Sequence, residues 1–230
     1  MKILIKLSGE ALSKNGEKYS EEVLKSIADK IKKLQEKNYK IALVVGGGNL
    51  FRGAQLSGNL SIERPTADYI GMLATVQNAL VLRDYFEDQG IQTRVSSSIT
   101  MTQIAEPYIP KRAERHLAKN RVVIFAAGLG SPFFSTDSAA AQRALELEVD
   151  LLVMAKNGVD GVYDKDPKTN PDAKKYSELT CSKVLKEHLK IADASAISIA
   201  RDHGLKIKVV SMEELDLIDD ENTGTNILAK

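Results

Sequence analysis

The sequence predicts an α/β fold, a three-layer αβα sandwich around a mostly parallel central sheet. Short apolar runs of β type alternate along the chain with stretches in which apolar residues recur at helical spacing, and this alternation is typical of a parallel sheet covered on both faces. Four of the runs, Ile3–Leu7, Ile41–Val45, Val122–Ala127 and Leu151–Ala155, lead directly into glycine-bearing turns. Because the carboxyl ends of parallel strands meet along one edge of a sheet, the four turns are expected to surround one crevice.

The first half of the chain is expected to alternate strands and helices. Between the first two strands, Ser20 is a favourable N-cap for a helix that ends at Asn38. After the second strand a long helix is expected over Thr66–Gln89, closed by Gly90, because glycine is common directly after a helix. The strand Ile91–Val95 should follow.

The second half continues this pattern, with a polar segment that holds two prolines between strand and helix. We see no internal repeat and no linker long enough to separate two domains, so residues 1–230 are expected to form one domain. This half holds the strands Val122–Ala127 and Leu151–Ala155 named above. The other expected elements are the basic helix Lys111–Lys119, a helix from Asp137 to Glu148, the polar segment Asn157–Tyr176, helices Ser182–His188 and Ala194–Asp202, the strand Lys206–Val210 and a short edge strand at Ile227–Leu228.

Composition sets limits on the class of protein. The formal net charge of +1 is unlike the basic excess of a nucleic-acid binder, so no nucleic-acid partner is expected. No apolar run approaches the length of a transmembrane helix, so no membrane partner is expected either. A single cysteine, Cys181, excludes an internal disulfide and suits a reducing compartment. We expect a cytoplasmic protein.

The Thr66–Gln89 helix is apolar around nearly its whole circumference. A helix of this kind is buried on all sides. One interpretation is a central core helix. The other, which we favour, is that its outer face meets a second subunit. Its apolar residues are Tyr69, Ile70, Met72, Leu73, Val76, Leu80, Val81, Leu82, Tyr85 and Phe86.

The four glycine turns are suited to binding phosphate groups. Glycine allows backbone N–H groups to approach an anion closely, and a following helix adds its positive N-terminus. The P-loop and Rossmann glycine patterns are both absent, and the three histidines have no metal-like spacing. The polar residues beside the turns suit phosphoryl transfer, which depends on positioning and on neutralising charge. They are Lys6, Arg52, Asp68, Thr136, Asp137 and Asp166.

Five motifs together resemble one enzyme family. They are KLSGEAL at 6–12, GGGNLFRG at 46–53, ADYIGMLA at 67–74, SPFFSTD at 131–137 and NGVDGVYDKDP at 157–167. In this order they resemble the bacterial uridylate (UMP) kinases, which have the amino-acid kinase fold and not the P-loop fold. The resemblance implies transfer of the γ-phosphoryl group of ATP to UMP, with Mg²⁺ bound to ATP, in pyrimidine (CTP) biosynthesis. It also implies a homohexamer and inhibition by UTP.

The resemblance implies three catalytic residues, Lys6, Arg52 and Asp137. Lys6 would bridge the transferring phosphoryl group, and Asp137 would orient the side chain of Lys6. The alternatives are a surface lysine at a strand end, a solvated loop arginine, and an aspartate that caps the following helix. The residues that match the ATP-binding positions of the family are Lys6, Leu7, Ser8, Gly9, Gly48, Arg52, Asn157, Tyr163 and Asp166. Of these, Tyr163 could instead cover the sheet edge, and Asp166 could form a turn.

The UMP-binding positions lie on two segments. Asp68 matches the carboxylate that contacts the ribose, although it could also be a first-turn acid favoured by the helix dipole. In the loop 129–136, Leu129 replaces a usual threonine and Ser131 a usual asparagine, so backbone contacts are expected there. Phe133 and Phe134 could be ordinary core residues. The implied UMP-binding residues are Gly47, Asp68, Leu129, Gly130, Ser131, Pro132, Phe133, Phe134, Ser135 and Thr136.

Regulation and two other functions stay open. The segment Lys14–Tyr19 has one glycine where the family has a glycine-rich stretch linked to GTP activation, so little GTP activation is expected. The alternatives to a UMP kinase are a kinase of the same fold that acts on a carboxylate, and a non-catalytic storage or regulatory relative. GGGNLFRG with PFFSTD is not the pattern of the carboxylate kinases, and the presence of Lys6, Arg52 and Asp137 favours an enzyme.

Overall fold

The computed structural model describes residues 1–51, 61–189 and 191–230. The four strands that lead into glycine turns are consecutive neighbours in one sheet, and their pairings are all parallel. They are β1 (Lys2–Leu7), β2 (Lys40–Val45), β5 (Val122–Ala126) and β6 (Leu151–Lys156), in the spatial order β5-β2-β1-β6. The expectation that the four turns share one edge of the sheet is therefore confirmed.

The sheet extends on both sides of these four strands. β3 (Thr93–Ser97) and β4 (Glu106–Pro107) continue it beyond β5, and β10 (Ile207–Ser211), β11 (Thr225–Leu228) and β9 (Glu178–Thr180) continue it beyond β6. Within the described chain the order is β4-β3-β5-β2-β1-β6-β10-β11-β9, and only β11 runs antiparallel to its neighbour β10. The two short strands β7 (Val162–Tyr163) and β8 (Lys175–Tyr176) pair with each other outside this sheet.

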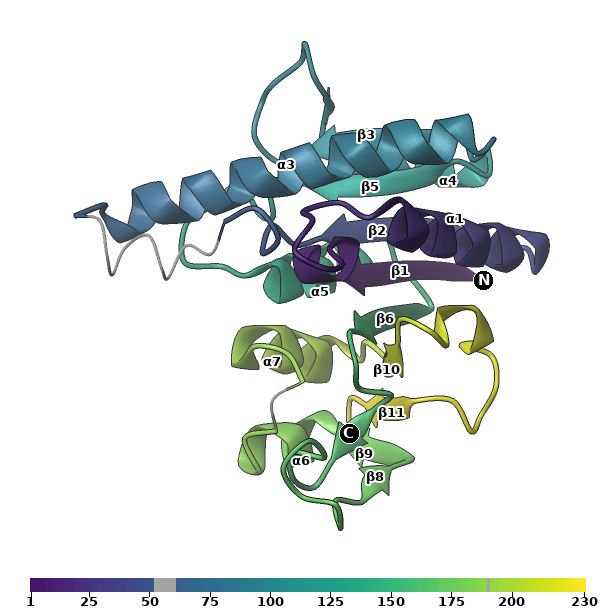
Figure 1. Cartoon of the computed structure of the whole chain (residues 1–230), viewed down its shortest axis with the longest axis vertical. Coiled ribbons are helices and arrows are strands. Elements are labelled where there is room, and N and C mark those ends of the chain that lie inside the picture. The colour runs from purple at the N-terminus through teal and green to yellow at the C-terminus, as the bar shows by residue number, and fades with distance from the viewer. Residues whose placement is uncertain (52–60, 190) are drawn as a thin grey trace.

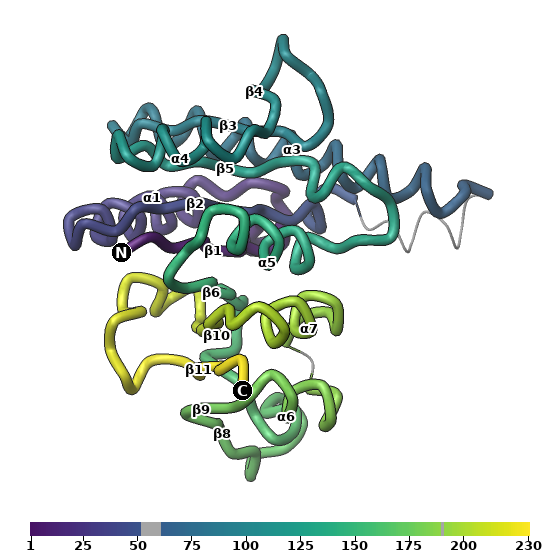
Figure 2. The backbone as a smooth tube through the Cα atoms, turned by 180° about the vertical axis from the view of Figure 1, so that it is seen from behind, coloured from purple at the N-terminus to yellow at the C-terminus, as the bar shows by residue number. Residues whose placement is uncertain are grey.

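Helices cover both faces of the sheet and make the predicted three layers. Figure 1 shows α1 (Glu21–Glu36) and α3 (Arg64–Asp88) across one face. The view from behind in Figure 2 shows the other face. That face carries α4 (Pro110–Ala118), α5 (Thr136–Glu146), α6 (Cys181–Lys186) and α7 (Ala194–His203). Short 3-10 turns follow β1 at Gly9–Leu12 (η1) and β10 at Leu215–Leu217 (η2).

Each central strand buries both of its faces. Ile3, Ile5 and Leu7 of β1 join the apolar cluster under α1 and α3, and Leu4 joins the cluster under α4, α5 and α7. Side chains of a strand alternate between the two faces of the sheet, so the buried stretch of a strand covered on both sides is a continuous apolar run. This is the physical reason why the central strands were predictable from continuous apolar runs.

The strand expected at Ile91–Val95 begins two residues later, at Thr93. Gly90 has a φ of 79°, and the N–H of Ile91 donates to the carbonyl of Phe86 at 2.8 Å. These features belong to the left-handed cap that ends α3, in which an apolar residue after the glycine packs back on the helix. Ile91 is therefore buried as part of the cap and not as part of the strand.

The long helix α3 is not buried on all sides within one chain. Met72, Val76 and Phe86 face the core and are nearly inaccessible. Tyr69 and Leu73 lie on its outer face and are 44% and 48% exposed. The alternative of a central core helix is therefore wrong for the isolated chain, and the outer apolar face is open in it.

A buried cluster of polar side chains ties α5 to the segment between β4 and α4. The guanidinium of Arg143 stacks on the ring of Tyr108, 3.8 Å from its centroid, and pairs with Glu146 at 2.6 Å. The Tyr108 hydroxyl also donates to Glu146. Burial raises the pKa of Glu146, but the hydrogen bonds from Tyr108, Gln142 and Arg143 outweigh it, so the pKa is lowered overall.

Replacing Glu146 by Gln tests this cluster. The change should lower the free energy of unfolding at pH 7 by about 1–2 kcal/mol, because Arg143 loses its charged partner. A carboxylate with a lowered folded-state pKa stabilises the protein above its unfolded value of about 4.3, and this contribution disappears as the pH falls through the folded value. The gap between wild type and Glu146→Gln in urea unfolding should therefore shrink from pH 7 to about pH 3. A gap that stays constant would show that the charge of Glu146 does not stabilise the fold.

Candidate active site

The turns after β1 and β2 touch each other. A Cβ atom on Gly9 would lie 2.5 Å from the backbone nitrogen of Gly48 and 2.6 Å from the carbonyl oxygen of Gly46. Both atoms are backbone, so a side chain at Gly9 would force the turns apart. The glycine in the first turn is thus required by close approach of two chain segments.

Lys6 and Asp137 form an ion pair at this edge of the sheet. Lys6 is the next-to-last residue of β1, and Asp137 is the second residue of α5. Their Nζ and Oδ1 atoms lie 2.7 Å apart, and their side chains are 14% and 17% exposed. The structure therefore brings together two of the three residues predicted to be catalytic. Arg52, the third, lies outside the described residues.

The expected alternative role of Asp137 as a helix cap is wrong. The N-cap of α5 is Ser135, whose hydroxyl oxygen accepts from the N–H groups of Asp137 and Ser138. Ser135 thus satisfies the first N–H groups of the helix, and the carboxylate of Asp137 can pair with Lys6. Its place in the first turn is also favourable for a negative charge.

Asp193 holds the beginning of α5, a role that the sequence did not indicate. The hydroxyls of Ser135 and Ser138 both donate to its carboxylate. The same carboxylate accepts from the N–H of Ala196 and so caps α7. Aspartate before a predicted helix is a common cap signal, but a contact with a second helix leaves no local trace in the sequence.

A cavity of about 170 Å³ opens between α3 and the turns after β2 and β5. Gly71, Met72 and Thr75 of α3 form one wall. Seven of the ten residues predicted to bind UMP line it, namely Gly47, Asp68, Leu129, Ser131, Phe134, Ser135 and Thr136. Gly130, Pro132 and Phe133 belong to the same loop but are not among its lining residues.

Asp68 joins α3 to the loop that follows β5. Its Oδ2 atom accepts from the N–H of Phe133 at 2.8 Å, and its Oδ1 atom accepts from Arg64 Nε at 2.8 Å. Because α3 begins at Arg64, Asp68 lies in the second turn of the helix. The alternative of a first-turn acid is therefore wrong, and Asp68 is held by contacts with named partners at the rim of the cavity.

Phe133 and Phe134 are not core residues. They are 68% and 53% exposed, and the guanidinium of Arg64 lies 5.7 Å from the centroid of the Phe133 ring. An exposed pair of large aromatic side chains beside a cavity is a common feature of ligand sites.

Two polar residues of α3, Thr75 and Asn78, hold the glycine turns, and sequence reasoning missed both. The hydroxyl of Thr75 accepts from the N–H of Ala127 at 2.8 Å, at the turn after β5. The amide of Asn78 donates to the carbonyl of Gly46 at 2.7 Å, and its oxygen accepts from Tyr19 at 2.8 Å. Asn78 is fully buried. Neither contact leaves a local signal in the sequence, because each depends on the turn that the fold brings against the helix.

A second cavity of about 690 Å³ lies over the carboxyl ends of β1 and β6. It is lined by five of the residues predicted to bind ATP, namely Lys6, Ser8, Asn157, Tyr163 and Asp166. Leu7 and Gly9 are buried beneath them. Gly48 lines the smaller cavity instead, so its assignment to ATP stays a prediction.

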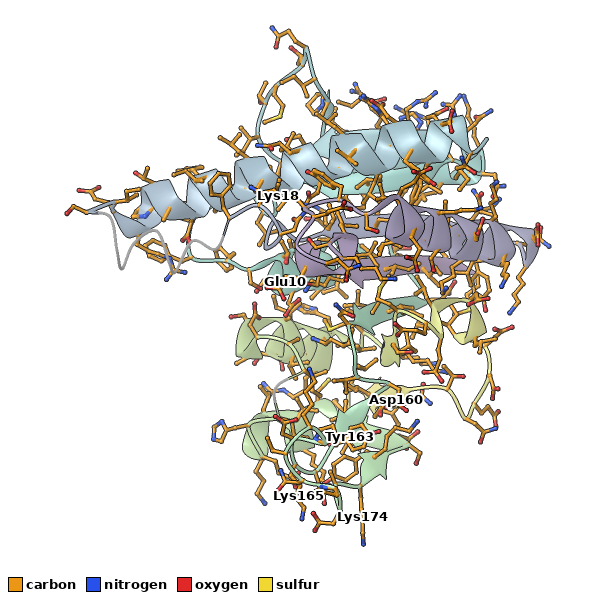
Figure 3. All side chains as sticks on the ribbon, in the orientation of Figure 1. Glu10, Lys18, Asp160, Tyr163, Lys165 and Lys174 are labelled. Atoms are coloured by element: carbon orange, nitrogen blue, oxygen red, sulfur yellow. The ribbon has the colours of Figure 1, made fainter. Side chains whose placement is uncertain are left out.

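Tyr163 is fixed at the outer end of the larger cavity. Its hydroxyl donates to Asp160 at 2.7 Å, and the two side chains lie together in Figure 3. Lys175 donates to the other oxygen of Asp160 at 2.9 Å. Burial raises the pKa of Asp160, but the hydrogen bonds from Lys175 and Tyr163 outweigh it and lower the pKa overall. Asp166 forms the expected turn by accepting from the N–H of Lys168, and it also lines the cavity.

The described ranges lack two features. No group of three or more His, Cys, Asp or Glu side chains is placed there to hold a metal ion. No helix in these ranges has the length and apolarity needed to cross a membrane.

Comparison with known proteins identifies the family. The sequence profile described as the amino acid kinase family matches residues 1–211. The chain belongs to this family. The uridylate kinase of Cutibacterium acnes is 49% identical over 230 residues, which cover 98% of this chain and 97% of that protein. The uridylate kinase of Streptomyces avermitilis is 52% identical over 210 residues, which cover 91% and 83%.

Solved structures of the amino acid kinase fold agree with this assignment. The UMP kinase of Bacillus anthracis superposes with a TM-score of 0.94 at 37% identity and covers all of this chain and 96% of its own. The UMP kinase of Ureaplasma parvum superposes with a TM-score of 0.92 at 34% identity and covers 99% and 98%. The predicted amino-acid kinase-like fold is confirmed.

The contact between Thr75 and Ala127 can be tested by Thr75→Val and Thr75→Ser. Valine keeps the volume but removes the acceptor, which leaves the buried N–H of Ala127 without a partner and should lower the free energy of unfolding by about 1–3 kcal/mol. Serine keeps the hydroxyl, so Thr75→Ser should lower the free energy of unfolding clearly less than Thr75→Val does. Urea unfolding of the two variants at one temperature measures the difference. Little loss in Thr75→Val together with a larger loss in Thr75→Ser would mean that the methyl group of Thr75, and not its hydroxyl, stabilises the turn.

Proposed function

We propose that this chain transfers the γ-phosphoryl group of ATP to UMP and releases ADP and UDP. One observation carries the proposal. The ion pair of Lys6 and Asp137 lies between two cavities, because Lys6 lines the larger one and Thr136, next to Asp137, lines the smaller one. Two substrates bound in adjacent cavities would meet at this pair. The relatives at about 50% identity are named uridylate kinase.

The larger cavity is the proposed ATP site. Asn157, Tyr163 and Asp166 hold the nucleoside at its outer end, and Ser8 with Gly9 offers backbone N–H groups to the phosphates. Mg²⁺ enters bound to ATP, since this ion prefers phosphate oxygens and water to a site made only of protein ligands. A divalent metal in this role is general for ATP-dependent kinases.

The smaller cavity is the proposed UMP site. Asp68 accepts from the ribose hydroxyls, and the loop 129–136 holds the base and the phosphate, chiefly through its backbone because Leu129 and Ser131 differ from the usual family residues. Gly47 allows the turn after β2 to approach UMP closely. The exposed rings of Phe133 and Phe134 offer apolar surface to the nucleotide.

The reaction needs charge neutralisation more than a base. The phosphate of UMP is largely dianionic at pH 7, because its second pKa is about 6. One of its oxygens forms a bond to the γ-phosphorus while the bond from that phosphorus to the β–γ bridging oxygen breaks, and the electron pair leaves with ADP. The ammonium of Lys6, oriented by Asp137, neutralises the moving charge. Arg52 is proposed to assist from the loop after β2.

Two other functions fit less well. A carboxylate kinase of the same fold would share Lys6 and the glycine turns, but the relatives with about 50% identity are named for uridylate. A non-catalytic relative would not need the paired charges of Lys6 and Asp137 beside two cavities.

Several properties follow as parts of the proposal. The activity serves pyrimidine nucleotide (CTP) synthesis in the cytoplasm, where ATP and UMP are available, and UTP inhibits it. Residues 1–230 form a single domain, a proposal supported by the one sheet that runs from β4 to β9.

A coupled assay of ADP release across UMP, CMP, dUMP and acetylglutamate tests the substrate. We expect the highest kcat/KM with UMP and none with acetylglutamate. Weaker use of dUMP than of UMP would support the ribose contact of Asp68. Phosphorylation of acetylglutamate in preference to UMP would overturn the proposal in favour of a carboxylate kinase.

Lys6→Ala should lower kcat by at least about 100-fold while the Kd for UMP changes little, because this charge acts mainly as the phosphoryl group moves. Lys25→Ala, at an exposed position on α1, is the matched control and should keep wild-type kinetics. Turnover near the wild-type rate in Lys6→Ala would remove Lys6 from the mechanism.

We also propose that copies of this chain associate through the outer face of α3, with a homohexamer as the expected assembly. Leu73, which is 48% exposed on that face, supports an apolar contact. Light scattering should report a mass of several times 25.2 kDa. Leu73→Glu should dissociate the assembly by burying an unpaired charge, whereas Leu73→Met should not. A wild-type mass of one chain would contradict the proposal.

A further inference from the structure

A second lysine, Lys156, opens on the same cavity as Lys6. It is the last residue of β6, the strand that pairs with β1, and the registered partner of Leu7 is Ala155, its neighbour in the chain. Lys6 and Lys156 therefore end adjacent parallel strands. Both line the cavity of about 690 Å³ proposed above for ATP.

Lys156 is half-buried, with little compensation for its charge. Within the described ranges its ammonium donates to the backbone carbonyl of Ile191, and no carboxylate lies within ion-pair distance of it. An ammonium group has three N–H donors, so donors remain for a ligand. A lysine partly withdrawn from water without a carboxylate partner is unfavourable for folding, and such a residue often has a functional reason.

The neighbouring charges leave this end of the cavity positive. Burial and the nearby charge of Lys6 lower the pKa of Lys156, and Asp137 raises it in part. Asp137 is already paired with Lys6 at 2.7 Å. Two ammonium groups thus share one carboxylate, and an incoming anion would neutralise the excess charge.

We propose that Lys156 is a second phosphate-binding cation, whose ammonium contacts the β- or γ-phosphate oxygens of ATP opposite Lys6. The proposal rests on the assignment of ATP to this cavity. The charge of the triphosphate replaces the missing carboxylate partner. Lys6 and Lys156, carried by adjacent strands, then hold the phosphates from two sides.

A purely structural role is the alternative, and Lys208 provides its matched control. Lys208 lies on β10, the strand next to β6, and is 4% exposed. Its ammonium donates to the carbonyls of Ile218 and Asp220 at 2.9 and 2.8 Å. Burial lowers its pKa as well. Like Lys156, it donates to backbone carbonyls and has a pKa lowered by burial, but it is more deeply buried and does not line the cavity.

The experiment separates the phosphates from the rest of the ligand. Calorimetry gives the Kd of ATP and of adenosine for the wild type, Lys156→Gln, Lys156→Met and Lys208→Met, each checked by its melting temperature. Glutamine keeps a donor near the carbonyl of Ile191 without the charge. The ratio of the adenosine Kd to the ATP Kd measures what the phosphates add.

In both Lys156 variants this ratio should fall about 10- to 100-fold, as expected for loss of one charged hydrogen bond, while the adenosine Kd stays within about twofold. Lys208→Met should lower the melting temperature and keep the wild-type ratio. An unchanged ratio in the Lys156 variants, or failure of both to fold, would overturn the proposal and assign Lys156 to the structure alone. If the wild type bound ATP no more tightly than adenosine, the assignment of the cavity to ATP would itself be wrong, and both proposals would fall.

Discussion

The active-site edge depends on one ion pair that is largely withdrawn from water. Lys6 reaches it from a strand and Asp137 from a helix, and either charge alone would be unfavourable at that depth. The pair can form because Ser135 caps α5, so the carboxylate of Asp137 is not needed for capping. Asp193 then fixes that cap from α7. A chain of polar contacts through three elements thus determines where a single ammonium group stands between two cavities.

Much of the fold could be predicted from local pattern, for a physical reason. The central strands bury both faces, so their continuous apolar runs are visible without knowledge of their neighbours. Glu106–Pro107 and Glu178–Thr180 form strands through pairing with a partner, and segments of only two or three residues are too short to show such a pattern. The start of β3 was predicted at Ile91, two residues too early, because Ile91 is apolar like a strand residue. In the structure Ile91 is buried as part of the cap of α3.

The residues of the site also fall into those that local pattern predicts and those that it does not. Lys6 and Asp137 stand beside glycine turns and within motifs, and these neighbours made them visible in the sequence. Thr75 and Asn78 act through tertiary contacts with turns about 50 and 30 residues away, which no local pattern records. Lys156 ends an apolar strand, as many surface lysines do, and only its partial burial and the position of Lys6 set it apart.

Both edges of the central sheet are short. β4 has two residues and includes Pro107, which has no N–H to donate, and β9 has three residues. A long unpaired edge would invite another chain to add a strand, and such additions propagate into aggregates. With little backbone available at either end, strand addition between chains is disfavoured, and contacts with another protein fall to side chains on the helical layers. The surfaces left for such contacts are ones whose composition can change residue by residue without altering the sheet or the edge that carries the active site.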